Sequence, residues 1–324
     1  MAGRRGGRRI GSSLVDPAGF LADLEAKPAA LLGLLDNLPD WNGVGTGPIV
    51  LTGMGSSFFA ADVGGRRLRR HGIAAVAELA SVEATHPPSP ELTVIGITAS
   101  GASVETVGLL AAHAGVSRTI ALTNDESAPL PADRAVLMHA GVEAGGVACR
   151  TYVHTLVGLL ALEQHLSGVD LRLGERLRRS AAAIAYLLDR RDGWLSPVAD
   201  AVDGTEGLWL LAPAERLGSA LQGALMVREG PRRAADGCET GDWNHVDVYL
   251  TKTLDYRALL FSGSRFDGEA LNWMIDRRSH VVTVGAEPAG VSASVRYPGD
   301  DDPIVALLTE VLVAELLAAK WWLG

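Results

Sequence analysis

A hydroxyl-rich turn at residues 98–103 has the residue types and spacing that suit the binding of an anion. It follows an apolar run of strand length and precedes apolar positions that recur at helical spacing, which predicts a strand, a turn and the start of a helix. Thr98, Ser100 and Ser103 supply hydroxyl donors, and Gly101 leaves room for the close approach of an anion. Ser103 can also cap the helix, so that free backbone N–H groups face the turn. The turn therefore predicts a phosphate site, with an ordinary capped turn between a strand and a helix as the alternative.

A second turn of this kind, Gly55-Ser56-Ser57, follows the short apolar run at 48–52. The carboxyl ends of parallel strands share one edge of a sheet, so we expect the two turns to lie at the same edge. The corresponding turn of the second half, at 212–215, lacks the glycines and the paired serines. If one half of the chain holds a phosphate, it should therefore be the first half.

The elements that must position these turns are strands that alternate with helices. Strands are expected at 48–52, 74–79, 92–98, 118–123 and 135–139 in the first half, and at 207–212, 256–261, 281–285 and 291–297 in the second. Helices are expected at 16–38 with an interruption at Pro28, and at 58–70, 104–114, 151–166, 173–188, 217–228, 268–278 and 304–323. This alternation predicts an α/β fold with parallel sheets covered on both faces, in which the second half is a pseudo-repeat of the first. The expected units are a tail at 1–15, a first domain at 16–168 and a second domain at 169–324.

The composition is that of a globular protein, with 48% apolar and 21% charged residues in a chain of 324. The net charge of -9 gives no electrostatic reason to expect nucleic acid as a partner. The exception is the basic tail, interpreted as disordered because it lacks apolar periodicity; its arginines are Arg4, Arg5, Arg8 and Arg9.

Two further absences in the sequence bear on location. No apolar run reaches the roughly 18 residues that span a bilayer, and the start shows no signal-peptide pattern, so we expect a cytoplasmic protein without a membrane partner. The cysteines, Cys149 and Cys238, match no metal spacing and no disulfide framework, which fits a reducing compartment.

Three more motifs follow in the order typical of one family: Glu78-x-Ala-Ser81, Leu122-Thr-Asn124 and Ala140-Gly-Val-Glu-Ala-Gly-Gly-Val-Ala-Cys-Arg-Thr-Tyr152. With the two hydroxyl turns, they resemble the sugar isomerase (SIS) domain family. From residue 20 onward the chain is similar to the isomerase half of glucosamine-6-phosphate synthases, and to sugar-phosphate deaminases and deglycases. The resemblance implies two SIS subdomains, each a five-stranded parallel sheet flanked by helices in a flavodoxin-like, three-layer arrangement.

The resemblance also implies roles for particular residues. The turn Gly55-Ser56-Ser57 and the hydroxyls of Thr98, Ser100 and Ser103 would hold the sugar phosphate, and the backbone around Val147 would contact the sugar.

In the second half, residues 220–229 look like the family's helix that ends in Lys/Arg-Glu. Glu229 would then move a proton between C1 and C2 of the sugar. His245, sixteen residues further on, fits the family's ring-opening histidine, which the neighbouring subunit of a homodimer supplies.

The chemistry gives its own reason for this pair. Interconverting an aldose and a ketose, or removing an amine from C2, requires an open ring and the removal of a proton beside a carbonyl or imine. A glutamate in a partly dry cleft and a histidine both titrate near the working pH. The alternatives are that Glu229 is a surface charge at a helix end and that His245 is a satisfied loop or core histidine.

Four acidic residues lie within ten positions of His245 in the sequence: Asp236, Glu239, Asp242 and Asp247. Their spacing matches no loop that binds a hard cation, and the family needs no metal, so no metal and no cofactor are expected. Asp242 or Glu239 is instead the candidate for recognising an amine or hydroxyls of the substrate.

The departures from the family pattern matter as well. Gln222 and Met226 stand where the synthases have a glutamate and a lysine, and His245-Val-Asp247 replaces His-Gly-Pro. The family's C-terminal tail with its lysine and the N-terminal glutaminase cysteine are expected to be absent, and Lys320 is interpreted as a solvated side chain.

The sequence therefore favours a sugar-phosphate isomerase or an aminosugar-phosphate deaminase or deglycase. The alternatives are a sensor that binds sugar phosphates without turnover and, less favoured, a structural partner without a ligand.

Overall fold

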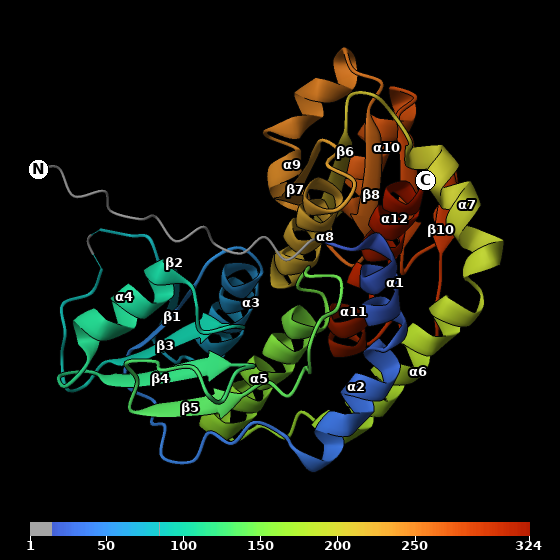
Figure 1. The fold of residues 1–324 in the computed structure, drawn as a ribbon. Helices are drawn as coiled ribbons and strands as arrows, with labels where there is room; N and C mark the ends of the chain where they lie inside the picture. Colours follow the sequence, from blue (N-terminus) through green and yellow to red (C-terminus); the bar gives the residue numbers. More distant parts are fainter. Residues whose placement is uncertain (1–14, 84) are drawn as a thin grey trace, which may run out of the picture.

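The structure is a computed structural model that describes residues 15–83 and 85–324, so nearly all of the predicted basic tail at 1–15 lies outside the described residues. Two parallel five-stranded sheets occupy two lobes (Figure 1). The predicted α/β fold with a parallel sheet in each half is confirmed.

The first sheet has the strand order β2-β1-β3-β4-β5, and every neighbouring pair is parallel. Its strands are β1 (Ile49–Gly53), β2 (Ala75–Leu79), β3 (Thr93–Thr98), β4 (Arg118–Thr123) and β5 (Arg134–Leu137). β1 and β3 are buried along their whole length, as central strands covered on both faces must be. The helices of this lobe are α3 (Ser56–Arg70), α4 (Val104–His113) and α5 (Arg150–Ser167).

The second sheet has the order β10-β9-β8-β6-β7, which repeats the order of the first sheet when it is read from the β7 edge. Its strands are β6 (Leu208–Ala212), β7 (Ala235–Glu239), β8 (Arg257–Phe261), β9 (His280–Val284) and β10 (Ala293–Val295). Its helices are α8 (Leu217–Glu229), α9 (Thr240–Trp243), α10 (Asp267–Asp276), α11 (Pro303–Thr309) and α12 (Val311–Leu323), with short 3-10 turns η2 (Ala214–Arg216) and η3 (Asp247–Lys252). The predicted pseudo-repeat is therefore present as a repeat of topology.

The remaining helices pack between the two lobes, except the last of them, which covers β9 and β10 of the second sheet. They are α1 (Pro17–Glu25), α2 (Lys27–Gly33), the 3-10 turn η1 (Leu34–Asp36), α6 (Leu173–Asp189) and α7 (Arg191–Val202). Although α1 and α2 begin the chain, they pack on α12 and α6, which lie late in it (Figure 1). One continuous core includes Phe20 of α1, Tyr152 of α5 and Leu210 of β6, so the two sheets are not separately packed units. The division at 168/169 stays a prediction.

Within the part of the chain that the structure describes, we find no helix whose length and apolar content would let it cross a bilayer.

Candidate functional site

The two hydroxyl turns lie side by side at the carboxyl edge of the first sheet, because β1 and β3 are hydrogen-bonded neighbours. The turn after β1 contains Gly55, whose φ of 52° is a left-handed value that favours glycine. α3 begins at once with Ser56, and among the described side chains none caps it. The half-buried Ser56 and Ser57 therefore stand at a helix start where N–H groups are free for an acceptor.

The turn after β3 is a capped start of α4. Ser103 accepts a hydrogen bond from the Thr106 N–H at 3.3 Å, as its sequence position predicts. Thr98 is buried at the strand end, whereas the side chain of Ser100 is exposed. A Cβ added to Gly101 would lie 2.3 Å from Cβ of Ala128, so this glycine is needed for packing against the following loop. Residue 101 thus has two reasons to be glycine: the contact with Ala128, and the room that a bound anion was expected to need.

A third segment at the same edge is the loop 139–149, which connects β5 to α5 and contains Val147. Asn124, just after β4, donates to the Gly141 carbonyl at 2.7 Å and accepts from the Ala140 N–H at 2.8 Å. Glu143 accepts from the N–H groups of Cys149 and Arg150, both at 2.6 Å. The loop is thus fixed at its start and at its junction with α5.

The middle of this loop rests on α1. The carboxylate of Asp23 accepts from the Gly145 N–H at 2.8 Å and pairs with Arg150 at 3.0 Å. The side chain of Val147 is buried, so only its backbone is available to a ligand. Asp23 carried no signal in the sequence, because its partners Gly145 and Arg150 lie more than 120 residues away.

Helix α8 brings the second lobe against these segments. Gln222 donates from Nε2 to the Ala148 carbonyl at 2.8 Å. A Cβ built on Gly55 would lie 3.9 Å from Cδ2 of Leu225. Glu229 follows Leu225 by one helical turn and so shares its face of α8. Glu229 therefore lies on the face of α8 that Leu225 turns toward Gly55, and its side chain is exposed.

The carboxyl group of Glu229 lies in an unusual electrostatic setting. Partial burial raises its pKa above the ordinary value, and the negative charge of Glu143 raises the pKa further. Both effects favour the protonated form, which is the direction that brings a carboxyl group closer to proton transfer near neutral pH.

His245 is placed differently. It follows α9 on the surface of the second lobe, and its N–H donates to the Asp242 carbonyl at 2.8 Å. Asp242 is exposed in α9, where its N–H donates to Glu239 at 2.8 Å. Within one subunit, no hydrogen bond or ion pair of the described residues links His245 or Asp242 to the first-lobe turns.

The departures from the family pattern have structural consequences. Gln222 and Met226 are both fully buried, and Oε1 of Gln222 is without a partner among the described atoms. Elsewhere in the core, Lys27 of α2 and Glu315 of α12 form a buried ion pair. Lys320 donates to Ser196 Oγ at 3.2 Å on the surface.

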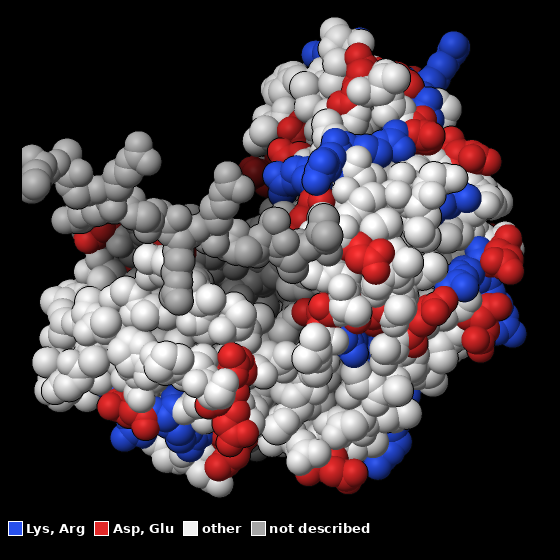
Figure 2. All heavy atoms as spheres, viewed as in Figure 1, with Lys and Arg blue, Asp and Glu red and all other residues white. Residues whose placement is uncertain are grey.

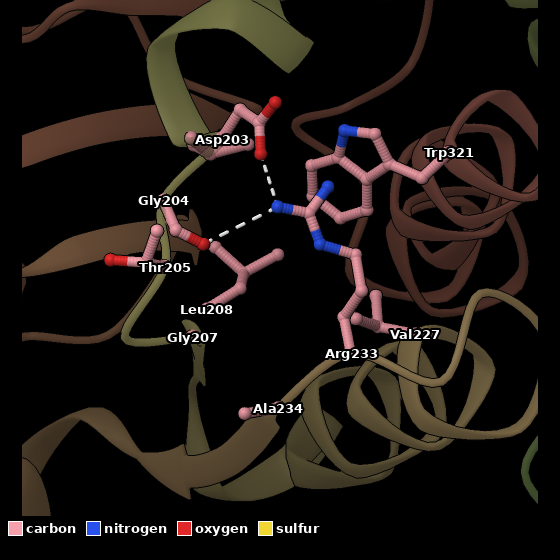
Figure 3. A pocket seen from close by; sticks show the side chains of 10 residues that line it. Asp203, Gly204, Thr205, Gly207, Leu208, Val227, Arg233, Ala234 and Trp321 are labelled. Carbon is pink, nitrogen blue, oxygen red and sulfur yellow. Dashed lines mark hydrogen bonds and ion pairs between the residues drawn. The ribbon is translucent and has the colours of Figure 1, made fainter. Parts of the chain in front are cut away.

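An open hollow of about 500 Å³ lies beside the turn that follows Glu229 (Figure 3). Asp203, Arg233 and Trp321 line it, at the amino ends of β6 and β7. It is thus distinct from the carboxyl edge of the first sheet. Among the described residues no group of three or more His, Cys, Asp or Glu side chains is arranged to hold a metal ion.

Comparison with known proteins adds to this geometry. No family model matches the sequence. The glutamine–fructose-6-phosphate aminotransferase [isomerizing] of Gloeobacter violaceus is 27% identical over 353 aligned positions, which cover 95% of this chain and 57% of that protein. The aminotransferase of the same name from Pyrococcus horikoshii is 28% identical over 216 positions, covering 62% of this chain and 36% of its own length. The chain thus spans at most a little over half the length of these relatives.

Solved structures agree on the fold. The C-terminal domain of the glucosamine-fructose-6-phosphate aminotransferase of Francisella tularensis superposes with a TM-score of 0.79, at 13% identity, over 98% of both chains. The chain therefore has the fold of that domain, with a parallel five-stranded sheet in each half.

Two further structures share this fold along most of the chain. They are the tagatose-6-phosphate ketose/aldose isomerase of Escherichia coli, with TM-score 0.76 and 18% identity over 94% of this chain and 92% of that one, and the glucosamine-6-phosphate deaminase of Thermotoga maritima, with TM-score 0.71 and 15% identity over 94% of both.

Proposed function

We propose that this SIS protein acts on a phosphorylated sugar or amino sugar, as a ketose–aldose isomerase or as an aminosugar-phosphate deaminase or deglycase. The turns at 55–57 and 98–103 would hold the phosphate, and the backbone around Val147 would contact the sugar. What supports the reaction class is the sequence similarity to aminotransferases named as isomerizing.

The proposed chemistry uses Glu229 as the group that carries the proton. Its carboxylate would take a proton from the carbon beside the carbonyl or protonated imine of the open-chain sugar, leaving an enediolate or, from the protonated imine, an enamine. The same carboxyl group would return the proton to the neighbouring carbon, so that the proton is conserved over the step. A raised pKa suits both halves of this transfer.

Ring opening is assigned to His245 of the partner subunit in a homodimer, and Asp242 is proposed to meet an amine or hydroxyl of the sugar. In support, His245 is exposed beside apolar side chains that are also exposed, Val246 at 57% and Tyr249 at 61%. Exposed apolar side chains of this kind suit a subunit interface. We place the protein in the cytoplasm, where its two free cysteines would stay reduced.

The observation that carries the proposal is the contact of α8 with the first lobe, through Gln222 on Ala148 and Leu225 beside Gly55. Glu229, the one acidic side chain of α8, follows Leu225 by one helical turn, and we propose that it reaches the hydroxyl turns. Glu229 is itself exposed at the end of α8, so its proposed role rests on this contact of α8 and on its raised pKa.

The test is thermal-shift screening against hexose, ketose and amino-sugar phosphates, with the unphosphorylated sugars as controls, followed by turnover assays. A phosphosugar that binds the folded state should raise the melting temperature, and its unphosphorylated form should not. E229Q should keep this shift but lose turnover by about 10²- to 10⁴-fold, the usual contribution of a positioned acid or base. Unchanged turnover in E229Q, or no stabilisation by any sugar phosphate, would remove the proposal.

A second candidate function is a sensor that binds a sugar phosphate without converting it. The uncharged Gln222 and Met226, both withdrawn from solvent, favour this alternative because they replace a charged pair beside the proton-transfer group. A sensor should show ligand-induced stabilisation in the wild type and no turnover for E229Q to lose.

A further inference from the structure

The turn 230–233 directly follows Glu229 and is packed under the last helix of the chain. A Cβ built on Gly230 would lie 2.9 Å from Cε3 and 3.3 Å from Cζ3 of Trp322. Real Cβ atoms do not approach a ring carbon that closely, so the indole occupies the space that a side chain at 230 would need. The Gly230 N–H also donates to the Met226 carbonyl at 3.0 Å, which closes the last turn of α8.

The neighbouring tryptophan holds the other end of the same turn. The guanidinium carbon of Arg233 lies 4.3 Å from the ring centroid of Trp321, a cation–π arrangement. Arg233 also pairs with Asp203 and donates to the Gly204 carbonyl at 3.3 Å (Figure 3). Its N–H returns to the Val227 carbonyl at 3.1 Å, so the turn is bonded to α8 at both ends.

Trp322 also contacts the element that supports the loop 139–149. Its ring centroid lies 5.9 Å from that of Phe20 on α1, at an interplanar angle of 52°. Phe20 in turn lies against Gly145 of the loop, where an added Cβ would be 2.5 Å from the Phe20 backbone nitrogen. One indole therefore touches both the turn after Glu229 and the support of the opposing loop.

We infer that Trp321 and Trp322 are positioning residues that fix the C-terminal end of α8, and with it Glu229, relative to the loop 139–149. The inference rests on the proposed function, since it gives Glu229 a role that depends on its place. Neither tryptophan belongs to the proposed sugar or phosphate contacts. Ordinary core packing is the competing explanation, and it predicts a loss of stability alone.

The experiment compares W322A and W322F with the wild type, well below their melting temperatures. W322A should lower kcat by about 10²-fold, the size expected when a reacting group is misplaced by about an ångström. KM for the sugar phosphate should change less than kcat, because the phosphate turns belong to the first lobe and Asp23 still supports the loop 139–149. W322F should recover part of kcat, since a phenyl ring still covers Gly230.

A matched control is W194A on α7. Trp194 is half-buried and donates from Nε1 to the Leu187 carbonyl at 3.0 Å, without contact to the turn 230–233. It should cost stability but leave kcat unchanged. G230A provides a second route to the same effect, since its new Cβ displaces Trp322, and G193A is its control because a Cβ at Gly193 meets open space.

Hydrogen exchange at the Gly230 and Arg233 amides gives a readout that needs no turnover. Both amides should exchange faster in W322A than in the wild type, and the Arg233 amide should also exchange faster in G230A. If these variants fold with unchanged kcat and unchanged exchange, the inference is wrong. If the wild type converts no sugar phosphate, the proposed function fails by itself, and the exchange data alone decide whether the tryptophans hold the end of α8.

Discussion

Glu229 shows how the same residue type changes character with its neighbours. At a helix end a glutamate is ordinarily a solvated charge of little consequence. Here burial and the nearby carboxylate of Glu143 raise its pKa. The N–H groups at the start of α5 donate to the carboxylate of Glu143 and so hold it in its position near Glu229.

A second titratable side chain ties stability to pH. His154 on α5 is 1% exposed, one ring nitrogen bonds the Met138 carbonyl at 2.9 Å, and the other is buried without a partner among the described atoms. Burial lowers its pKa from 6.5 to about 4. The unfolded chain therefore binds a proton at this histidine below pH 6.5, while the folded chain does not until about pH 4.

We predict that the protein loses stability as the pH falls from 6.5 toward 4. The contribution of His154 is about 3 kcal/mol over that interval, because each pH unit is worth about 1.4 kcal/mol. Urea denaturation midpoints of wild type and H154N, measured at pH 7 and pH 5, test this. Asparagine can still donate to the Met138 carbonyl but does not titrate, so H154N should show a shallower pH dependence. Equal losses of stability between pH 7 and pH 5 in the two proteins would contradict the role of His154. Some pH dependence should remain in H154N, because the pKa of the buried His113 is also lowered.

Among the helices, α1 supports the loop 139–149, a contact that its position in the sequence did not indicate. The interruption of 16–38 at Lys27-Pro28 was predicted and is confirmed, since α1 ends at Glu25 and α2 begins at Lys27. The sequence did not reveal that α1 lies under the loop 139–149. That contact depends on Asp23, Gly145 and Arg150, which are distant in sequence and meet only in the folded chain.

We predict that D23A loosens this loop and weakens sugar-phosphate binding. The variant leaves the Gly145 N–H without its acceptor and Arg150 with an uncompensated charge, so stability should fall by about 3–5 kcal/mol. E25Q is the control on the same helix, because Glu25 pairs with Arg191 on an exposed surface and should matter by less than about 1 kcal/mol. Melting temperatures and phosphosugar dissociation constants of both variants are the measurements. A D23A protein with unchanged affinity would show that α1 does not support binding.

The elements also show where sequence patterns stop being informative. Continuous apolar runs predicted β1, β3 and β4 close to their bounds, because central strands are buried on both faces. β7 was missed, since Ala-Asp-Gly-Cys-Glu is a partly exposed edge strand without an apolar run. α7 was missed as well, and it contains Pro197, which normally argues against a helix.

The candidate site divides in the same way. The hydroxyl turns are local patterns and could be predicted, including the cap by Ser103. Glu229 and His245 came from the family resemblance, and their roles stay predictions. The contacts of Asp23 and Trp322 with segments of the site could not be predicted from the sequence, because they depend on how whole helices pack.

For the whole molecule, one shared core holds the two sheets at a fixed relation. On the face in Figure 2, charged side chains are spread over the second lobe, whereas on the first lobe they gather along its lower edge. Exposed apolar side chains lie at the carboxyl edge of the first sheet, Val142 at 91% and Val104 at 81%, and beside His245. These two sets are the surfaces through which two subunits would meet if His245 enters the partner's site.

We predict that two inactive variants restore activity when mixed. E229Q and H245A should each be inactive alone. In a homodimer with His245 supplied in trans, a mixed dimer contains one site with both Glu229 and His245 intact. Random exchange of equal amounts should then recover about a quarter of the wild-type activity, because half of the dimers are mixed and each has one working site of two. Native mass spectrometry with one subunit tagged measures the mixed dimers directly. If mixed dimers form and no activity returns, His245 is not supplied by the partner subunit. The proposed role of His245 would then be wrong, whereas that of Glu229 would be unaffected.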